Sequence, residues 1–314
     1  MTSWQDIQKE IDSGKTPEKP NGDFDGVRRA KYVLVSNLTQ RPLLIYATAF
    51  HVPHKAQIAG PLLSIDLSDK NGFAEIIRNV NGPAVDVFLH SPGGSAEATE
   101  SIVRMLRSKF ETVRFIVTGE AKSAATMLAL SGNSILMNQS AELGPIDPQV
   151  RVRNRFSAAG SVIEQFKKAA DDLRKDPSRL PVWIPILQEF APALQIECKN
   201  YINLSKKLVR TWLADFMFKG DRAARKKAQK IARYLSNEKN SLSHARRIDA
   251  EQLLKLGAKI EILEQQDPQL QDAVRQLHLA VMATLDSTGA VKIFENSAGA
   301  VLIRSVNIAV TPAP

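Results

Sequence analysis

Residues 85–98 read VDVFLHSPGGSAEA, residues 113–132 read VRFIVTGEAKSAATMLALSG, and residues 134–149 read SILMNQSAELGPIDPQ. The runs VDVFLH and VRFIV predict two strands that are buried on both faces. Pro-Gly-Gly follows the first strand, and a turn of small residues that carries Ser123 follows the second. Two such strand ends can lie side by side in one sheet. One end then offers free backbone amides and the other a hydroxyl, which is the arrangement that acyl-transfer serine enzymes use.

The segments around this stretch predict an α/β protein. Helical periodicity after the glycine pair and after Ser123 produces a strand–helix–strand–helix–strand order, which is typical of a parallel sheet with right-handed crossovers. Further strands are expected at residues 31–37 (KYVLVSN) and 42–50 (PLLIYATAF). Residues 247–263 predict a helix capped by Asp249 and a strand that returns to the sheet.

Changes in composition and in hydrophobic periodicity divide the chain into five parts. The prolines in PSRLPVWIP predict a break between the helices of residues 151–247. We expect an N-terminal helix and linker (1–27), a core (28–150), a basic helical insertion (151–247), a returning helix, strand and helix of the core (248–286), and a C-terminal hairpin (287–314).

Composition limits the functional classes. The chain has 314 residues, of which 44% are hydrophobic, so a sizeable core is available. Its one cysteine, Cys198, excludes an intramolecular disulfide and a cysteine-based zinc site, and we expect neither a metal nor a cofactor. The apolar runs are shorter than the roughly 20 residues of a membrane span. The N-terminus lacks a secretory pattern, so we expect a cytoplasmic protein without a membrane span.

The net charge of +9 is concentrated in residues 206–247. The plain interpretation is a solvated helix face. The alternative is a groove for an acidic partner or nucleic acid. The basic run of residues 222–233 has no aromatic residue within it, which argues against binding of single-stranded nucleic acid.

Each candidate motif has a catalytic and a structural interpretation. Gly93 and Gly94 can bring free amides close to an oxyanion, or can form an ordinary strand-to-helix turn. Ser123 can be a nucleophile, with the Ala124 amide as a further oxyanion donor, or can be a plain N-cap serine. The two motifs in this order and spacing favour the catalytic interpretation.

The order SPGG, GEAKSAA and AELGPIDPQ resembles that of the Clp-peptidase and crotonase superfamily. The chain is most similar to the serine dehydrogenase proteinase family, which is related to signal peptide peptidase A, and the likeness covers about residues 30–285. It implies a Clp/crotonase-like parallel sheet with flanking helices and a helical insertion. It further implies Ser123 as the nucleophile, with Gly93, Gly94 and Ala124 at the oxyanion-hole positions.

The resemblance leaves the general base open. The histidine of the Clp peptidases falls within residues 143–146 and their aspartate near His244, and this chain has neither residue there. Signal peptide peptidases use a lysine instead, which implies one of Lys167, Lys168 and Lys175 here, with Lys167 favoured, provided that burial lowers its pKa. His244 is the rival base. Each has a solvated alternative, and Asp147 is expected to be a turn residue or a partner of Lys122.

We therefore expect an ATP-independent serine peptidase that cleaves peptide bonds in a peptide or protein substrate and forms a homo-oligomer. One alternative is a non-catalytic Clp-like scaffold or binding protein. Another is a crotonase-like acyl-CoA enzyme, which would use the oxyanion hole without a serine. A nucleic-acid-associated role through residues 206–247 is a third.

Overall fold

A central sheet of seven strands organises the computed structural model, which describes residues 1–307. The strand order is β11-β10-β1-β2-β3-β5-β9, and the five strands from β1 to β9 are parallel. The expected α/β class with a largely parallel sheet is confirmed. The strands are β1 (Leu43–Thr48), β2 (Ala84–His90), β3 (Thr112–Val117), β5 (Ser134–Met137), β9 (Ile260–Ile262), β10 (Ala290–Asn296) and β11 (Val301–Ser305).

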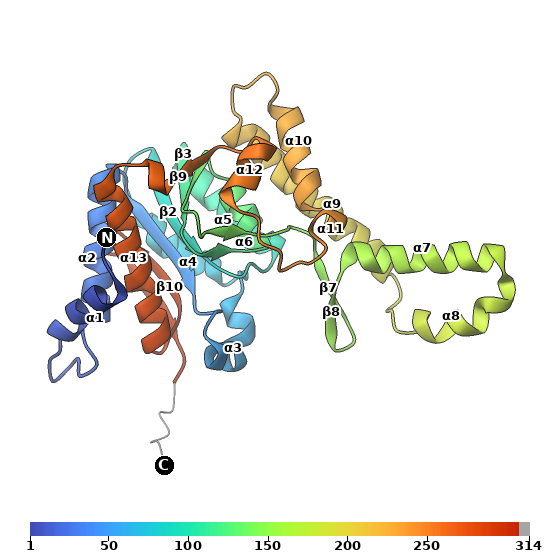
Figure 1. Cartoon of the computed structure of the whole chain (residues 1–314), viewed down its shortest axis with the longest axis horizontal. Coiled ribbons are helices and arrows are strands. Elements are labelled where there is room, and N and C mark those ends of the chain that lie inside the picture. The colour runs from blue at the N-terminus through green and yellow to red at the C-terminus, as the bar shows by residue number, and fades with distance from the viewer. Residues whose placement is uncertain (308–314) are drawn as a thin grey trace, which may run out of the picture.

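Helices cover both faces of this sheet (Figure 1). Alternate side chains of each strand point to opposite faces, so Val87 and Leu89 of β2 pack on one side and Phe88 on the other. The first face lies under α4 (Asp69–Arg78), α5 (Ala96–Lys109), α6 (Ala124–Leu130), α9 (Leu194–Trp212), α10 (Ala224–Leu235) and α12 (Ala250–Leu256). The second lies under α2 (Phe24–Thr39), α3 (Pro53–Ala59) and α13 (Pro268–Ser287).

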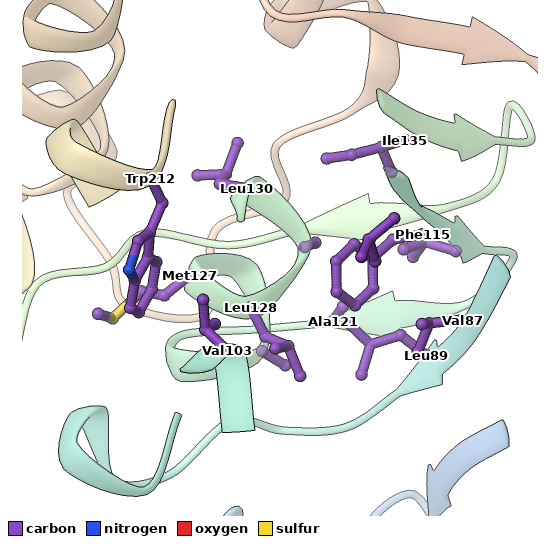
Figure 2. Packing of buried hydrophobic residues seen from close by; sticks show 14 of the residues in the cluster. Val87, Leu89, Val103, Phe115, Ala121, Met127, Leu128, Leu130, Ile135 and Trp212 are labelled. Carbon is purple, nitrogen blue, oxygen red and sulfur yellow. The ribbon is translucent and has the colours of Figure 1, made fainter. Parts of the chain in front are cut away.

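A large cluster of buried apolar side chains lies beneath the glycine and serine turns. Figure 2 shows Phe115 of β3 between the strand residues Val87 and Leu89 and the α6 residue Leu128. Trp212 of α9 packs at the far end of the same cluster. This packing makes the platform that supports α6, and α6 carries Ser123 at its start.

Residues 31–37 form part of helix α2 and not the strand that we expected. Asp23 caps the helix, since its Oδ1 accepts a hydrogen bond from the Gly26 amide at 3.0 Å. Arg28, Tyr32 and Val35 are buried on one face, which is helical spacing, and the helix packs on α13. The β-branched and apolar run in KYVLVSN therefore misled the prediction, because tertiary packing overrode local propensity.

A helical arm projects from the body (Figure 1). It consists of the hairpin β7 (Gln149–Val152) and β8 (Arg155–Ala158) and the helices α7 (Ala159–Lys175) and α8 (Leu180–Leu187). The expected break at PSRLPVWIP is present at residues 176–179, after α7 ends, but the prediction is wrong for residues 180–187, which are helical. Pro181 lies in the first turn, where its missing amide has no helical partner to lose. Pro185 removes a single bond from this short helix.

The other predicted elements form as expected. Helix α1 (Trp4–Ser13) opens the chain, Asp249 caps α12 through the Gln252 amide at 2.9 Å, and residues 291–306 form the hairpin of β10 and β11, whose strands join the main sheet. Short elements near the site are β4 (Glu120–Ala121), β6 (Glu142–Leu143) and α11 (Glu238–Ser241). None of the helices within residues 1–307 combines the length and apolar character needed to cross a membrane.

Candidate active site

The glycine turn and the serine turn meet at the carboxyl edge of the sheet. Ser91 follows β2 and pairs with Ala121 of β4 as an isolated parallel bridge. The Ser91 amide donates to the Glu120 carbonyl at 3.0 Å, and the Lys122 amide donates to the Ser91 carbonyl at 3.0 Å. These two bonds hold the SPGG turn against the residues on either side of Ser123.

Glycine is required at position 93 by close approach. Its φ is +96°, and a Cβ there would lie 2.4 Å from the Lys122 carbonyl oxygen and 2.7 Å from the Ser123 Cβ. Gly94 has a φ of +151°, and its Cβ would lie 2.2 Å from the Ile65 carbonyl oxygen. A side chain at position 93 would separate the two turns, and one at position 94 would displace the backbone of Ile65.

Ser123 sits in a strained backbone conformation between β4 and α6. Its φ is 51° and its ψ is −119°, a region that non-glycine residues rarely occupy. Its side chain does not cap α6, so the N-cap interpretation does not describe it. A serine on a sharp strand-to-helix turn, with its hydroxyl free, is the geometry of a nucleophile elbow. Strain of this kind persists where the surrounding structure enforces it, often at active sites.

Two free amides lie next to this serine. Within residues 1–307, the amides of Gly94 and Ala124 donate no hydrogen bond. The Gly93 amide is different, because it donates to the Ser91 hydroxyl at 3.2 Å. In this conformation Gly93 is not available as the third oxyanion donor that we expected. Its contribution is the close contact that only a glycine permits.

Neither Lys122 nor Lys167 has the surroundings of a general base for Ser123. Lys122 forms an ion pair with Glu142 and lies 3.4 Å from the Leu143 carbonyl oxygen. Lys167 is exposed on α7 and is not among the residues that line the cavity at Ser123. A lysine base requires burial, which Lys167 does not have in this structure. Lys167 therefore stays a prediction that no contact supports.

His244 has the surroundings of a general base. Its Nδ1 lies 3.0 Å from Oδ1 of Asp147, whose side chain is only 2% exposed. Asp147 is further held by Gln149, which donates to Oδ2 at 2.7 Å. A carboxylate on Nδ1 selects the tautomer that leaves Nε2 free to accept a proton. This pairing replaces the turn role that we expected of Asp147.

The pair arises from a long-range contact. Leu143 and Ile248 form an antiparallel bridge, with amide-to-carbonyl distances of 2.9 and 3.1 Å. The bridge brings the segment before α12 alongside the loop after β6. The resemblance placed the Clp histidine at residues 143–146 and the Clp aspartate near His244, and here Asp147 and His244 occupy these neighbourhoods in exchanged order. That exchange is the signal from which the pair could have been predicted.

Ser123 and His244 share one cavity of about 540 Å³. Gly94 and Ala124 also line it, so the residues that carry the free amides, the hydroxyl and the imidazole border a common space. Ser123 and His244 make no direct hydrogen bond in this structure. Catalytic hydrogen bonds are commonly long without substrate and tighten when it binds. Apolar side chains complete the wall, among them Met127, Ile146, Val150, Leu194 and Leu204.

A strained serine, free backbone amides and a histidine–carboxylate pair at one edge of a parallel sheet define the serine-hydrolase class of site. Residues 61–183 match the family of ClpP-like SDH-type serine proteinases. The resemblance seen in the sequence is thereby confirmed over this segment. The match contains Gly93, Gly94, Ser123 and Asp147, whereas His244 lies outside it.

Several curated proteins are similar to parts of the chain. Two uncharacterised proteins of Methanocaldococcus jannaschii are 32% identical over 102 residues and 24% identical over 178 residues, which are 31% and 56% of this chain. A protein of Pyrococcus horikoshii named membrane-bound protease PH1510 is 29% identical over 119 residues, which are 37% of this chain and 26% of the P. horikoshii protein. The chain spans only 36% and 51% of the two M. jannaschii proteins.

Solved structures of mutants of a 1510-N membrane-bound stomatin-specific protease are also similar to the chain. One has a TM-score of 0.40 and 17% sequence identity, and the matched region covers 63% of this chain and 74% of the solved chain. The other, in complex with a substrate peptide, has a TM-score of 0.40 and 19% identity and covers 63% and 70%.

Proposed function

We propose that the protein is a serine peptidase in which Ser123 is the nucleophile and His244, oriented by Asp147, is the general base. The observation that carries the proposal is the strained, uncapped conformation of Ser123 beside two free amides. The match to a family of serine proteinases supports the peptidase class. That the substrate is a peptide or protein is also part of the proposal, because the chain spans only part of the length of its curated relatives.

In the proposed first step, Ser123 Oγ attacks the scissile carbonyl carbon while His244 Nε2 takes the hydroxyl proton. The carbonyl oxygen becomes an oxyanion and accepts hydrogen bonds from the Gly94 and Ala124 amides. The C–N bond then breaks, and His244 gives its proton to the leaving amine. One donor of this kind contributes about 2.7–4 kcal/mol to transition-state stabilisation.

In the second step, His244 removes a proton from water, which attacks the acyl-enzyme ester. The tetrahedral intermediate collapses, the acid product leaves, and Ser123 recovers its proton. Asp147 stays ionised throughout and stabilises the imidazolium that forms in each half-reaction.

The same observations weigh on the alternatives. A crotonase-like enzyme needs the oxyanion amides but has no use for a strained serine between them. A non-catalytic scaffold has no need of a buried carboxylate that orients a histidine into the cavity of Ser123. Cleavage without ATP is part of our proposal and follows the family resemblance. The cytoplasmic location and the homo-oligomer stay predictions.

Labelling with a fluorophosphonate probe tests the proposal. We expect the wild-type protein to be labelled and Ser123→Ala not to be labelled. His244→Ala should slow labelling by several orders of magnitude, whereas the matched control Lys167→Ala should leave it unchanged. Absence of wild-type labelling would refute the nucleophile, and slow labelling of Lys167→Ala with normal His244→Ala would transfer the base role to the lysine.

A further inference from the structure

A buried ion pair lies next to the segment that holds the glycine turn. Lys292 Nζ lies 2.7 Å and 2.9 Å from the two oxygens of Asp69, and both side chains are fully buried. The Tyr46 hydroxyl donates to Oδ2 of Asp69 at 2.7 Å. Apolar residues of similar volume often stabilise a core as well as a buried ion pair does. The sheet alone therefore does not explain why three polar groups are gathered here.

The ion pair is connected to Gly94 through the backbone of residues 64–66. Lys292 Nζ donates to the Ser64 carbonyl at 2.9 Å. The Ile65 amide donates to the Gly93 carbonyl at 2.7 Å, and the Ser95 amide donates to the Ile65 carbonyl at 2.9 Å. Ile65 therefore binds the chain on both sides of Gly94 and sets the plane of the peptide that carries its free amide.

Tyr46 also lies close to the glycine turn. Burial raises the pKa of Tyr46 well above its usual value, and the neighbouring Ser91 hydroxyl opposes that shift. The Ser91 hydroxyl accepts a hydrogen bond from the Gly93 amide at 3.2 Å. Tyr46 is thus hydrogen-bonded to Asp69 and neighbours the first residue of the glycine turn, while Gly94 is linked to Asp69 through Lys292.

We propose that Asp69, Lys292 and Tyr46 are positioning residues that hold the Gly94 amide in the direction needed to bind the oxyanion. This inference rests on the proposed peptidase function. Oxyanion donors accelerate a reaction only when they are fixed before charge develops, and fixed donors need supporting hydrogen bonds. Asp69 lies on α4, Lys292 on β10 and Tyr46 on β1, so this support for the Gly94 amide does not come from the serine turn.

Two variants separate positioning from folding. Tyr46→Phe removes one hydroxyl and keeps the ring that packs 5.2 Å from Phe73 and from Phe294, measured between ring centroids. Asp69→Asn removes the buried charge. The matched control is Glu295→Gln, because Glu295 also lies on β10, is fully buried and pairs with Arg28 at 2.6 Å, but makes no contact with residues 64–66 or 91–95.

Labelling rates and hydrogen exchange are measured on the full chain. We expect Tyr46→Phe to slow fluorophosphonate acylation by about threefold to tenfold, which is part of the contribution of one hydrogen bond to a carboxylate, and Asp69→Asn to slow it more. In peptide cleavage, kcat should fall while KM stays within about twofold, because the oxyanion forms only in the transition state. Amide exchange in residues 93–95 should speed up in both variants and remain unchanged in Glu295→Gln.

Two outcomes would overturn the proposal: unchanged exchange in residues 93–95, or a control variant that slows acylation as much as Asp69→Asn does. If Asp69→Asn does not fold, the double variant Asp69→Asn/Lys292→Met removes both charges and should show the same faster exchange. If the wild-type protein is not labelled, the peptidase proposal fails on its own. The exchange comparison then still decides whether this network holds the glycine turn.

Discussion

Replacing Ser123 with glycine is expected to stabilise the fold and to abolish labelling. The backbone of Ser123 has a φ of 51° and a ψ of −119°, where glycine is unstrained and other residues are not. The wild-type chain adopts this conformation because the glycine turn and the start of α6 enforce it. Removing the Cβ relieves the strain without changing the turn.

The size of the effect follows from two opposing contributions. A residue held in a sparsely populated backbone region costs about 1–3 kcal/mol. Glycine loses more backbone freedom on folding, which offsets about 0.5–1 kcal/mol of that gain. Ser123 caps no helix, so no capping bond is lost. The net gain is about 0–2.5 kcal/mol, centred on about 1 kcal/mol, whereas Ser123→Ala keeps the strain and should match the wild type within about 0.5 kcal/mol.

Urea unfolding of the wild type, Ser123→Gly and Ser123→Ala at one pH measures this difference. Both variants lose the nucleophile, so the comparison between them isolates the backbone conformation from catalysis. A glycine variant that is no more stable than the alanine variant would refute the reasoning, and with it the interpretation of this turn as a strained nucleophile elbow.

Three further predictions follow from the site and its surroundings. Asp147→Asn should lower kcat by about three to four orders of magnitude, as expected when a histidine base loses the carboxylate that sets its tautomer, with little change in urea stability. Gly93→Ala should destabilise the fold by about 1–3 kcal/mol in urea unfolding, because the new Cβ would meet the Lys122 carbonyl oxygen at 2.4 Å. Burial lowers the pKa of His278 from 6.5 to about 4, so the unfolded chain binds the proton more tightly. Stability should therefore rise between about pH 4 and pH 6.5, by an amount on the order of 3 kcal/mol, and stay level above that range. Urea titrations across this range should show a smaller slope for His278→Gln, and an equal slope would contradict the assignment.

Much of the fold could be predicted because its signals are local. The strand that ends in SPGG, the helix after it and the capped helix α12 each follow from periodicity and capping residues within one segment. Helix α2 could not be predicted in this way. Its β-branched run fits a strand, and only the burial of Arg28, Tyr32 and Val35 against α13 and the sheet makes a helix.

The general base of the candidate site is another feature that local sequence patterns could not predict. His244 and Asp147 are 97 residues apart, and no local pattern connects their two segments, which only the family resemblance relates to each other. They meet because the Leu143–Ile248 bridge brings their segments together. Lys167 had the favourable sequence setting, an apolar stretch before it, yet its helix leaves the body with the arm and its side chain is exposed.

The sequence by itself determined the parallel sheet, the glycine turn and the position of Ser123. Two backbone segments can approach this closely only where glycine or other small residues stand, and such residues can be recognised directly in the sequence. The tertiary structure decided which amides are free, that the serine is strained, and that His244, paired with Asp147, lines the cavity at Ser123. Those properties depend on hydrogen bonds and contacts between distant segments, which no local pattern encodes.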